Sequence, residues 1–146
     1  MSYIDTRDLI EERNNLKEQI LDDFNDRFNT ELDDFDEIET YLNDEASENI
    51  NEDERDDFKS YWEDEYQQID AIDEVENAVG SEFTYGCTLI EEDDFEDYVR
   101  ELLVDIDCIP KDFPSWIEID WEATSENVKQ DYSELKYKDK IYYFRN

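Results

Sequence analysis

Acidic side chains recur along the first half of the chain at helical spacings, and a regular row of carboxylates is a surface suited to a cationic partner. Two rows begin at Asp22 and at Glu52, and most of their steps are 4 or 7 residues. Side chains at these spacings lie on one face of a helix, so each row predicts a ridge of negative charge. We expect the ridges to bind the partner through Asp22, Asp26, Asp33, Asp36, Glu37, Glu52, Asp56, Glu63, Asp70 and Glu74.

The density of charge in this segment is close to that of a nucleic acid. Residues 22–76 hold 24 acidic residues, which a continuous helix would distribute over ~83 Å, or one carboxylate every ~3.4 Å. One strand of duplex DNA carries one phosphate per ~3.4 Å of helix axis. The two helices together therefore predict a surface that mimics the phosphate array of DNA.

Rows of acidic residues are also the ordinary solvated face of an amphipathic helix. Such a face normally mixes both signs of charge, whereas residues 22–76 contain only Arg27, Arg55 and Lys59 as basic residues. Unpaired like charges destabilise the compact state through self-repulsion. Because the sequence keeps these unpaired acidic residues despite their cost to stability, we favour a functional acidic surface over a merely solvated one.

The composition excludes several other functions. The 146 residues include 47 acidic and 13 basic residues, a net charge of −34, two glycines and no histidine. Without histidine there is no imidazole for a nucleophile pair or for a zinc site, and two glycines do not make a phosphate-binding loop. No acidic run matches a calcium-binding loop. We therefore expect no enzymatic activity, no catalytic residue, no metal and no cofactor.

The sign of the charge also restricts the partners. Phosphate groups would be repelled, so we expect neither direct binding to nucleic acid nor binding to an anionic membrane. No apolar run approaches the length that spans a bilayer, and the first residues carry no secretory signal. We expect a soluble cytoplasmic protein in which Cys87 and Cys108 are reduced, semi-buried thiols.

The apolar residues of the first half predict two helices that would position the acidic rows. Residues 1–79 contain neither Gly nor Pro, and apolar residues recur from 16 to 42 at a mean spacing of ~3.7 residues, close to the helical period of ~3.6. We expect one long helix over residues 6–43, a loop over 44–51, and a second helix that begins at a capping box at Asn51 and ends at Gly80.

The second half predicts a small mixed unit. The expected elements, in order, are a short strand over 83–90, a helix over 94–106, a proline-containing loop, a helix over 120–132 capped by Asp120, and a β-hairpin over 135–144 that turns at Lys138–Asp139. The fold class is therefore α+β, mainly α, with an acidic helical hairpin in residues 1–79 and a small α+β domain in residues 80–146. We expect four further aromatic residues to pack in the core: Tyr61, Trp62, Trp116 and Trp121.

The second half also resembles a group of small acidic bacteriophage proteins described as antirestriction or ArdA-like. The residues that carry the resemblance are Tyr85-Gly86-Cys87-Thr88-Leu89-Ile90, Phe95 and Tyr98, Asp105-Ile106, Ile119-Asp120-Trp121-Glu122-Ala123 and Asp131-Tyr132. The ArdA family is known for mimicking bent duplex DNA and blocking type I restriction–modification enzymes. The resemblance implies a phage or mobile-element origin, expression in the cytoplasm of a bacterial host, and evasion of host defence.

Three hypotheses follow from the sequence. The leading one is a double-stranded DNA mimic that inhibits a host DNA-binding enzyme by occupying its basic groove. A restriction–modification enzyme is the first expected partner, with a CRISPR effector or a uracil-DNA glycosylase behind it, and the one-sided apolar stripes would also allow a homodimer. The second is an acidic chaperone or assembly factor for a basic protein. In the third, the acidity is an adaptation to high salt or keeps the protein soluble.

Overall fold

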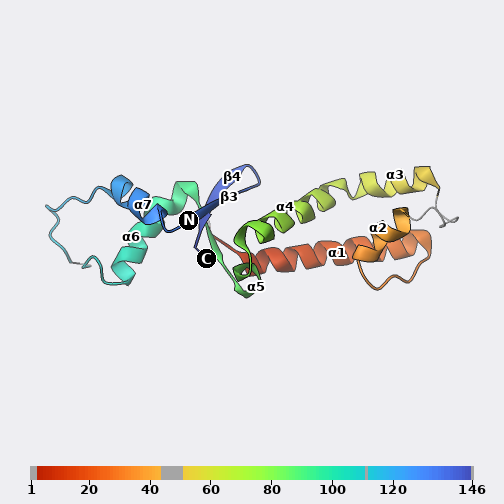
Figure 1. Cartoon of the computed structure of the whole chain (residues 1–146), viewed down its shortest axis with the longest axis horizontal. Coiled ribbons are helices and arrows are strands. Elements are labelled where there is room, and N and C mark those ends of the chain that lie inside the picture. The colour runs from red at the N-terminus through yellow and green to blue at the C-terminus, as the bar shows by residue number, and fades with distance from the viewer. Residues whose placement is uncertain (1–2, 44–50, 111, 146) are drawn as a thin grey trace. The chain divides into compact units, whose positions relative to one another are not determined.

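The computed structural model describes residues 3–43, 51–110 and 112–145. It confirms a mainly helical α+β protein with one four-stranded antiparallel sheet (Figure 1). The contacts within the chain divide it into two compact units. One unit is formed by residues 10–73, and the other by residues 1–9 together with 74–146.

The unit formed by residues 10–73 is built from helices. They are α1 (Thr6–Phe28), α2 (Asp36–Asn43), α3 (Glu52–Tyr61) and α4 (Glu63–Val79), of which the first begins and the last ends in the other unit. Arg13 forms an ion pair with Asp73 at 2.7 Å, whereas Trp62 contacts Asp23 further along α1. The start of α1 therefore lies beside the later residues of α4, and the later part of α1 lies beside the junction of α3 and α4. The two arms of the hairpin, α1 and α3–α4, are thus antiparallel, as expected (Figure 1).

The expectation of one continuous helix over residues 6–43 is wrong, because α1 ends at Phe28. Asn29 has a left-handed backbone, with φ of 52°, which ends a helix. The Asn25 side chain then holds the following loop, since its Oδ1 accepts from Thr30 Oγ1 at 2.8 Å and from the Leu32 N–H at 3.0 Å, while its Nδ2 donates to the Leu32 carbonyl at 3.0 Å. The chain resumes as α2 in a new direction.

The second predicted helix forms in two parts. Asn51 caps α3 as expected, because its side chain accepts a hydrogen bond of 2.7 Å from the Glu54 N–H. The helix is interrupted at Trp62, whose φ of −102° and ψ of 13° depart from helical values, and α4 follows directly. Gly80, with φ of 81°, ends α4 at the predicted position. The predicted loop over residues 44–51 lies outside the described residues, except for Asn51.

The apolar stripes predicted for this unit do form its core. Six side chains are buried together: Ile20, Phe24, Ile38, Leu42, Phe58 and Ile69. The rings of Phe24 and Phe58 meet edge to face with centroids 5.3 Å apart, which joins α1 to α3. The apolar residues predicted from the helical spacing therefore still share one core after the chain changes direction, because the apolar face of α2 packs against the same core as α1.

The other unit contains the sheet, whose strand order is β1-β2-β4-β3. The strands are β1 (Tyr3–Asp5), β2 (Thr88–Glu91), β3 (Ser133–Tyr137) and β4 (Lys140–Phe144), and all pairings are antiparallel. The predicted hairpin of β3 and β4 is confirmed, because Lys138 and Asp139 both have the left-handed φ angles of a tight two-residue turn. Strand β1 was not predicted from the sequence, and it pairs with β2, which begins only at Thr88.

The same unit also contains helices. They are α5 (Glu82–Tyr85), α6 (Phe95–Asp105) and α7 (Trp121–Lys129), with a 3-10 turn, η1 (Glu92–Asp94), before α6. The predicted helix over 94–106 is confirmed as α6, and that over 120–132 forms with its Asp120 cap but ends at Lys129. The predicted strand over 83–90 is correct only from Thr88, because residues 82–85 form α5. Phe95 and Val99 pack on Ile90 and Tyr143 of the sheet.

Candidate protein-binding surface

All ten acidic residues predicted to contact a partner have exposed side chains. The first row does not lie on one helix, because the chain breaks at Asn29: Asp22 and Asp26 lie on α1, Asp33 lies in the loop, and Asp36 and Glu37 begin α2. The second row follows two consecutive helices, with Glu52 and Asp56 on α3 and with Glu63, Asp70 and Glu74 on α4.

The second arm of the hairpin has a carboxylate density close to that of DNA. Residues 52–73 contain ten acidic residues, of which eight are exposed. At ~1.5 Å per helical residue these 22 residues span ~33 Å, or one carboxylate every ~3.3 Å. A strand of duplex DNA has one phosphate per ~3.4 Å. The match holds for helices α3 and α4 as they form, and does not depend on the uninterrupted helix that the sequence suggested.

The basic residues of this unit leave the predicted acids unpaired. Arg13 and Arg27 form ion pairs of 2.7 Å with Asp73 and Asp23, and neither of these two aspartates belongs to the predicted set. Among the described residues, none of the ten predicted acids forms an ion pair with a lysine or arginine. Their charge is therefore directed to solvent and to any cationic partner.

Some of the acidic residues also have a local structural role. Asp36 and Glu37 lie in the first turn of α2, Glu52 in that of α3, and Glu63 in that of α4. Negative charge near a helix N-terminus interacts favourably with the helix dipole, by about 0.3–1 kcal/mol at exposed positions. These four acids therefore stabilise the helices that carry them, whereas Asp22, Asp26, Asp33, Asp56, Asp70 and Glu74 lie outside such first turns.

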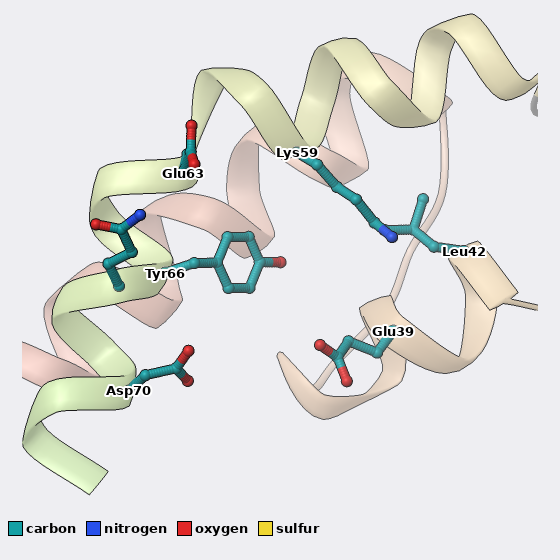
Figure 2. Close-up of a pocket in the computed structure, with 7 residues that line it drawn as sticks. Glu39, Leu42, Lys59, Glu63, Tyr66 and Asp70 are labelled. Carbon is teal, nitrogen blue, oxygen red and sulfur yellow. The ribbon is translucent and has the colours of Figure 1, made fainter. Parts of the chain in front are cut away.

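The acidic surface contains a groove between α2 and α4 that was not predicted from the sequence. It consists of two hollows of about 320 and 340 Å³ that share Glu39, Tyr66 and Asp70. Figure 2 shows Glu39 on α2 and Asp70 on α4 with their carboxylates facing across the gap, and the Tyr66 ring projecting from α4 toward α2. We call this the α2–α4 groove. Its further lining residues are Lys17, Phe35, Asp36, Leu42, Lys59, Glu63, Gln67, Ile69 and Asp73.

Tyr66 is the central side chain of the groove. Its ring lies 5.6 Å from that of Phe35, so two aromatic side chains form part of the wall. Burial raises the pKa of the Tyr66 phenol to about 12, and the nearby carboxylate of Glu39 adds to the increase. The phenol is therefore protonated at neutral pH. The groove was not predicted from the sequence, because it exists only once α2 has folded back.

Two of the four aromatic residues expected in the core lie at the surface instead. Tyr61 is 64 % exposed and Trp116 is 80 % exposed, whereas Trp62 and Trp121 are partly buried. Tyr61 is the last residue of α3, and Trp116 lies in the loop between α6 and α7. The two cysteines are free, as expected, but Cys87 is buried and Cys108 is exposed rather than both being semi-buried.

Residues 3–43, 51–110 and 112–145 contain neither clustered metal ligands nor a helix that could span a membrane. No group of three or more Cys, Asp or Glu side chains in these ranges is arranged to hold a metal ion. None of the helices described is both long enough and apolar enough to cross a bilayer.

Comparison with known proteins gives no family assignment. No family model, no curated protein and no solved structure matches this chain. The resemblance to ArdA-like proteins therefore stays a prediction, and the function is inferred from the chemistry of the surface.

Proposed function

We propose that this protein is a double-stranded DNA mimic that inhibits a DNA-binding enzyme by occupying its basic groove, and that it is not itself an enzyme. The observation that carries the proposal is the unpaired carboxylate array of the helical hairpin. Residues 52–73 have one acidic residue per ~3.3 Å of helix, and the ten acids singled out by their spacing are all exposed and without ion pairs among the described residues.

The physical basis of inhibition would be electrostatic steering followed by competition. A groove that binds DNA carries lysine and arginine side chains at the spacing of phosphates, and a protein with complementary charge meets it at a high, salt-sensitive rate. The rigid core beneath α1, α3 and α4 favours a fixed array over a flexible polyanion, because Phe24 and Phe58 are fully buried between the helices that carry the acids. Restriction–modification enzymes are the first partners to test, followed by CRISPR effectors and uracil-DNA glycosylases.

Competition with DNA is the test of this proposal. The protein is immobilised, a bacterial lysate is passed over it at low salt, and the retained proteins are eluted with short duplex DNA. We expect duplex DNA to displace a nuclease, a methyltransferase or another DNA enzyme. General retention of basic proteins that duplex DNA does not displace would instead support an acidic chaperone or assembly factor.

A pair of matched variants distinguishes a defined array from net charge. The first replaces four acids of the array, Asp22→Asn, Asp26→Asn, Asp56→Asn and Glu63→Gln. The control makes the same change at four exposed acids of the other unit, Asp93→Asn, Asp97→Asn, Asp112→Asn and Glu118→Gln. A mimic loses affinity for the captured enzyme only in the first variant. Equal losses in both variants would contradict the proposal.

A further inference from the structure

The α2–α4 groove combines an acidic rim with an aromatic wall. Five carboxylates line its two hollows, and the rings of Phe35 and Tyr66 lie beside them together with the apolar side chains of Leu42 and Ile69. The acidic residues are Asp36, Glu39, Glu63, Asp70 and Asp73. This lining offers a cation both negative charge and a surface of low polarity.

The groove already accommodates cationic side chains of the chain itself. Of the five basic residues in residues 10–73, Lys17 lines one hollow and Lys59 lines the other. The Lys17 ammonium lies 5.4 Å from the centre of the Phe35 ring, which is a cation–π distance. Two lysines do not balance five carboxylates, so the groove keeps a net negative charge that another cation can neutralise.

The facing carboxylates favour a planar cation. Glu39 and Asp70 approach the gap from opposite helices, and the Tyr66 ring lies beside the same gap (Figure 2). A guanidinium group presents five donors in a plane, pairs with carboxylates through two hydrogen bonds and stacks on aromatic rings, whereas an ammonium is a compact and strongly hydrated charge. Arginine is also the side chain with which proteins most often contact DNA bases and phosphates with defined geometry.

We propose that the α2–α4 groove binds the guanidinium group of an arginine side chain on the partner's cationic surface, held by Glu39 and Asp70 against the ring of Tyr66. The proposal rests on the proposed function for the identity of the partner, and it assigns to the groove the recognition of one residue type. The carboxylates outside the groove then supply steering and general attraction, while the groove fixes the register of the partner.

Binding of an arginine peptide to the full chain tests this assignment. The probe is a short unstructured peptide of alternating Gly and Arg, compared by calorimetry with the same peptide in which Lys replaces Arg. The groove variant is Glu39→Gln with Asp70→Asn, and the matched control is Glu31→Gln with Asp64→Asn, which are exposed and outside the groove. We expect about tenfold weaker arginine binding for the groove variant and less than about twofold for the control.

The ring of Tyr66 provides a second readout that does not depend on a variant folding. In the wild-type protein, the NMR resonances of the Tyr66 ring should shift as the arginine peptide is added, and shift much less with the lysine peptide. Equal weakening by both double variants, equal affinity for the two peptides, or unmoved Tyr66 resonances would each overturn the proposal.

The two proposals can fail separately. If the groove variant competes with duplex DNA as well as the wild type does, the DNA-mimic proposal is supported and the arginine site is contradicted. Selective arginine binding that the groove variant loses, without any competition with duplex DNA, would establish the site and contradict the mimic.

Discussion

The indole N–H of Trp62 donates a hydrogen bond of 2.7 Å to Asp23 Oδ2, which connects α1 to the junction between α3 and α4. The same oxygen lies 2.7 Å from the Arg27 guanidinium, and Arg27 in turn lies 4.6 Å from the centre of the Tyr61 ring. One carboxylate therefore holds both arms of the hairpin at the point where the second arm is interrupted.

Replacing Trp62 with Phe should destabilise the protein, because it removes the hydrogen bond to Asp23 and part of a half-buried ring. We expect the free energy of unfolding to fall by about 1–2 kcal/mol, measured by urea denaturation followed by circular dichroism. Tyr61→Phe is the control, since it keeps an exposed ring over Arg27 and should change the stability by less than about 0.5 kcal/mol. A Trp62→Phe variant as stable as this control would show that the hydrogen bond contributes nothing.

Asn25 should contribute more to stability than an exposed asparagine of the same helix, because its side chain makes three hydrogen bonds to the loop that follows α1. Asn25→Ala leaves the Leu32 backbone groups without these partners, and we expect a loss of about 1–3 kcal/mol in the free energy of unfolding. Asn15→Ala on the exposed face of the same helix should be neutral or slightly stabilising, because alanine is the better helix former. Similar effects of both substitutions would mean that Asn25 does not organise the loop.

The features that the sequence predicted well depend on local chemistry. Asn51 and Asp120 cap helices because their side chains accept from backbone N–H groups three residues ahead. Lys138 and Asp139 form the hairpin turn between two segments of strand-forming residues. The buried stripe also follows from spacing alone, because apolar residues at helical intervals pack on a core whichever way their helix runs.

The features that the sequence missed depend on contacts between distant residues. The loop after α1 is held by Asn25, whose side chain forms hydrogen bonds with Leu32 seven residues later. A polar residue within a helical pattern does not by itself predict such a contact. The three residues of β1 are too few for a strand pattern, and their partner β2 begins at Thr88. The α2–α4 groove forms only because the chain changes direction after Asn29, so it could not be predicted from the sequence either.

Thr6 should be essential to the unit that contains the sheet. Its buried hydroxyl donates to the Phe83 carbonyl at 2.9 Å and accepts from the Cys87 N–H at 2.8 Å. Thr6→Val keeps the shape but leaves both backbone groups without their side-chain partner, so we expect a loss of about 2–4 kcal/mol, measured by chemical denaturation. Thr6→Ser should retain most of the stability because it keeps the hydroxyl. If Val and Ser are tolerated equally, the two hydrogen bonds are not needed.

Salt should stabilise the protein, because residues 10–73 contain 25 acidic and five basic residues. Raising NaCl from 10 mM to 1 M shortens the screening length from ~30 Å to ~3 Å and weakens repulsion between carboxylates. We expect the midpoint of thermal unfolding to rise over this range. The variant with four neutralised acids at positions 22, 26, 56 and 63 should start from a higher midpoint and rise less. A wild-type midpoint that falls with salt would contradict the account.

Stability should decrease at high pH through Tyr66. Its pKa is about 12 in the folded protein because the ring is desolvated and Glu39 lies nearby, whereas a tyrosine in an unfolded chain titrates near ~10. Between these values the unfolded chain loses the phenolic proton first, so ionisation favours unfolding and the free energy of unfolding falls as pH rises from ~10 to ~12. Burial raises the pKa of Tyr132 in the same direction, so it contributes to the same fall.

Tyr66→Phe separates the contribution of the groove from that of Tyr132. The variant has no phenol at position 66, so its free energy of unfolding should decline less steeply between pH 10 and 12 than that of the wild type, as measured by urea denaturation at each pH. Absorbance at 295 nm should show one fewer late-ionising tyrosine among the ten in the chain. Identical slopes for the two proteins would mean that the Tyr66 phenol is solvated, and that the groove lacks the sheltered wall on which a guanidinium would stack.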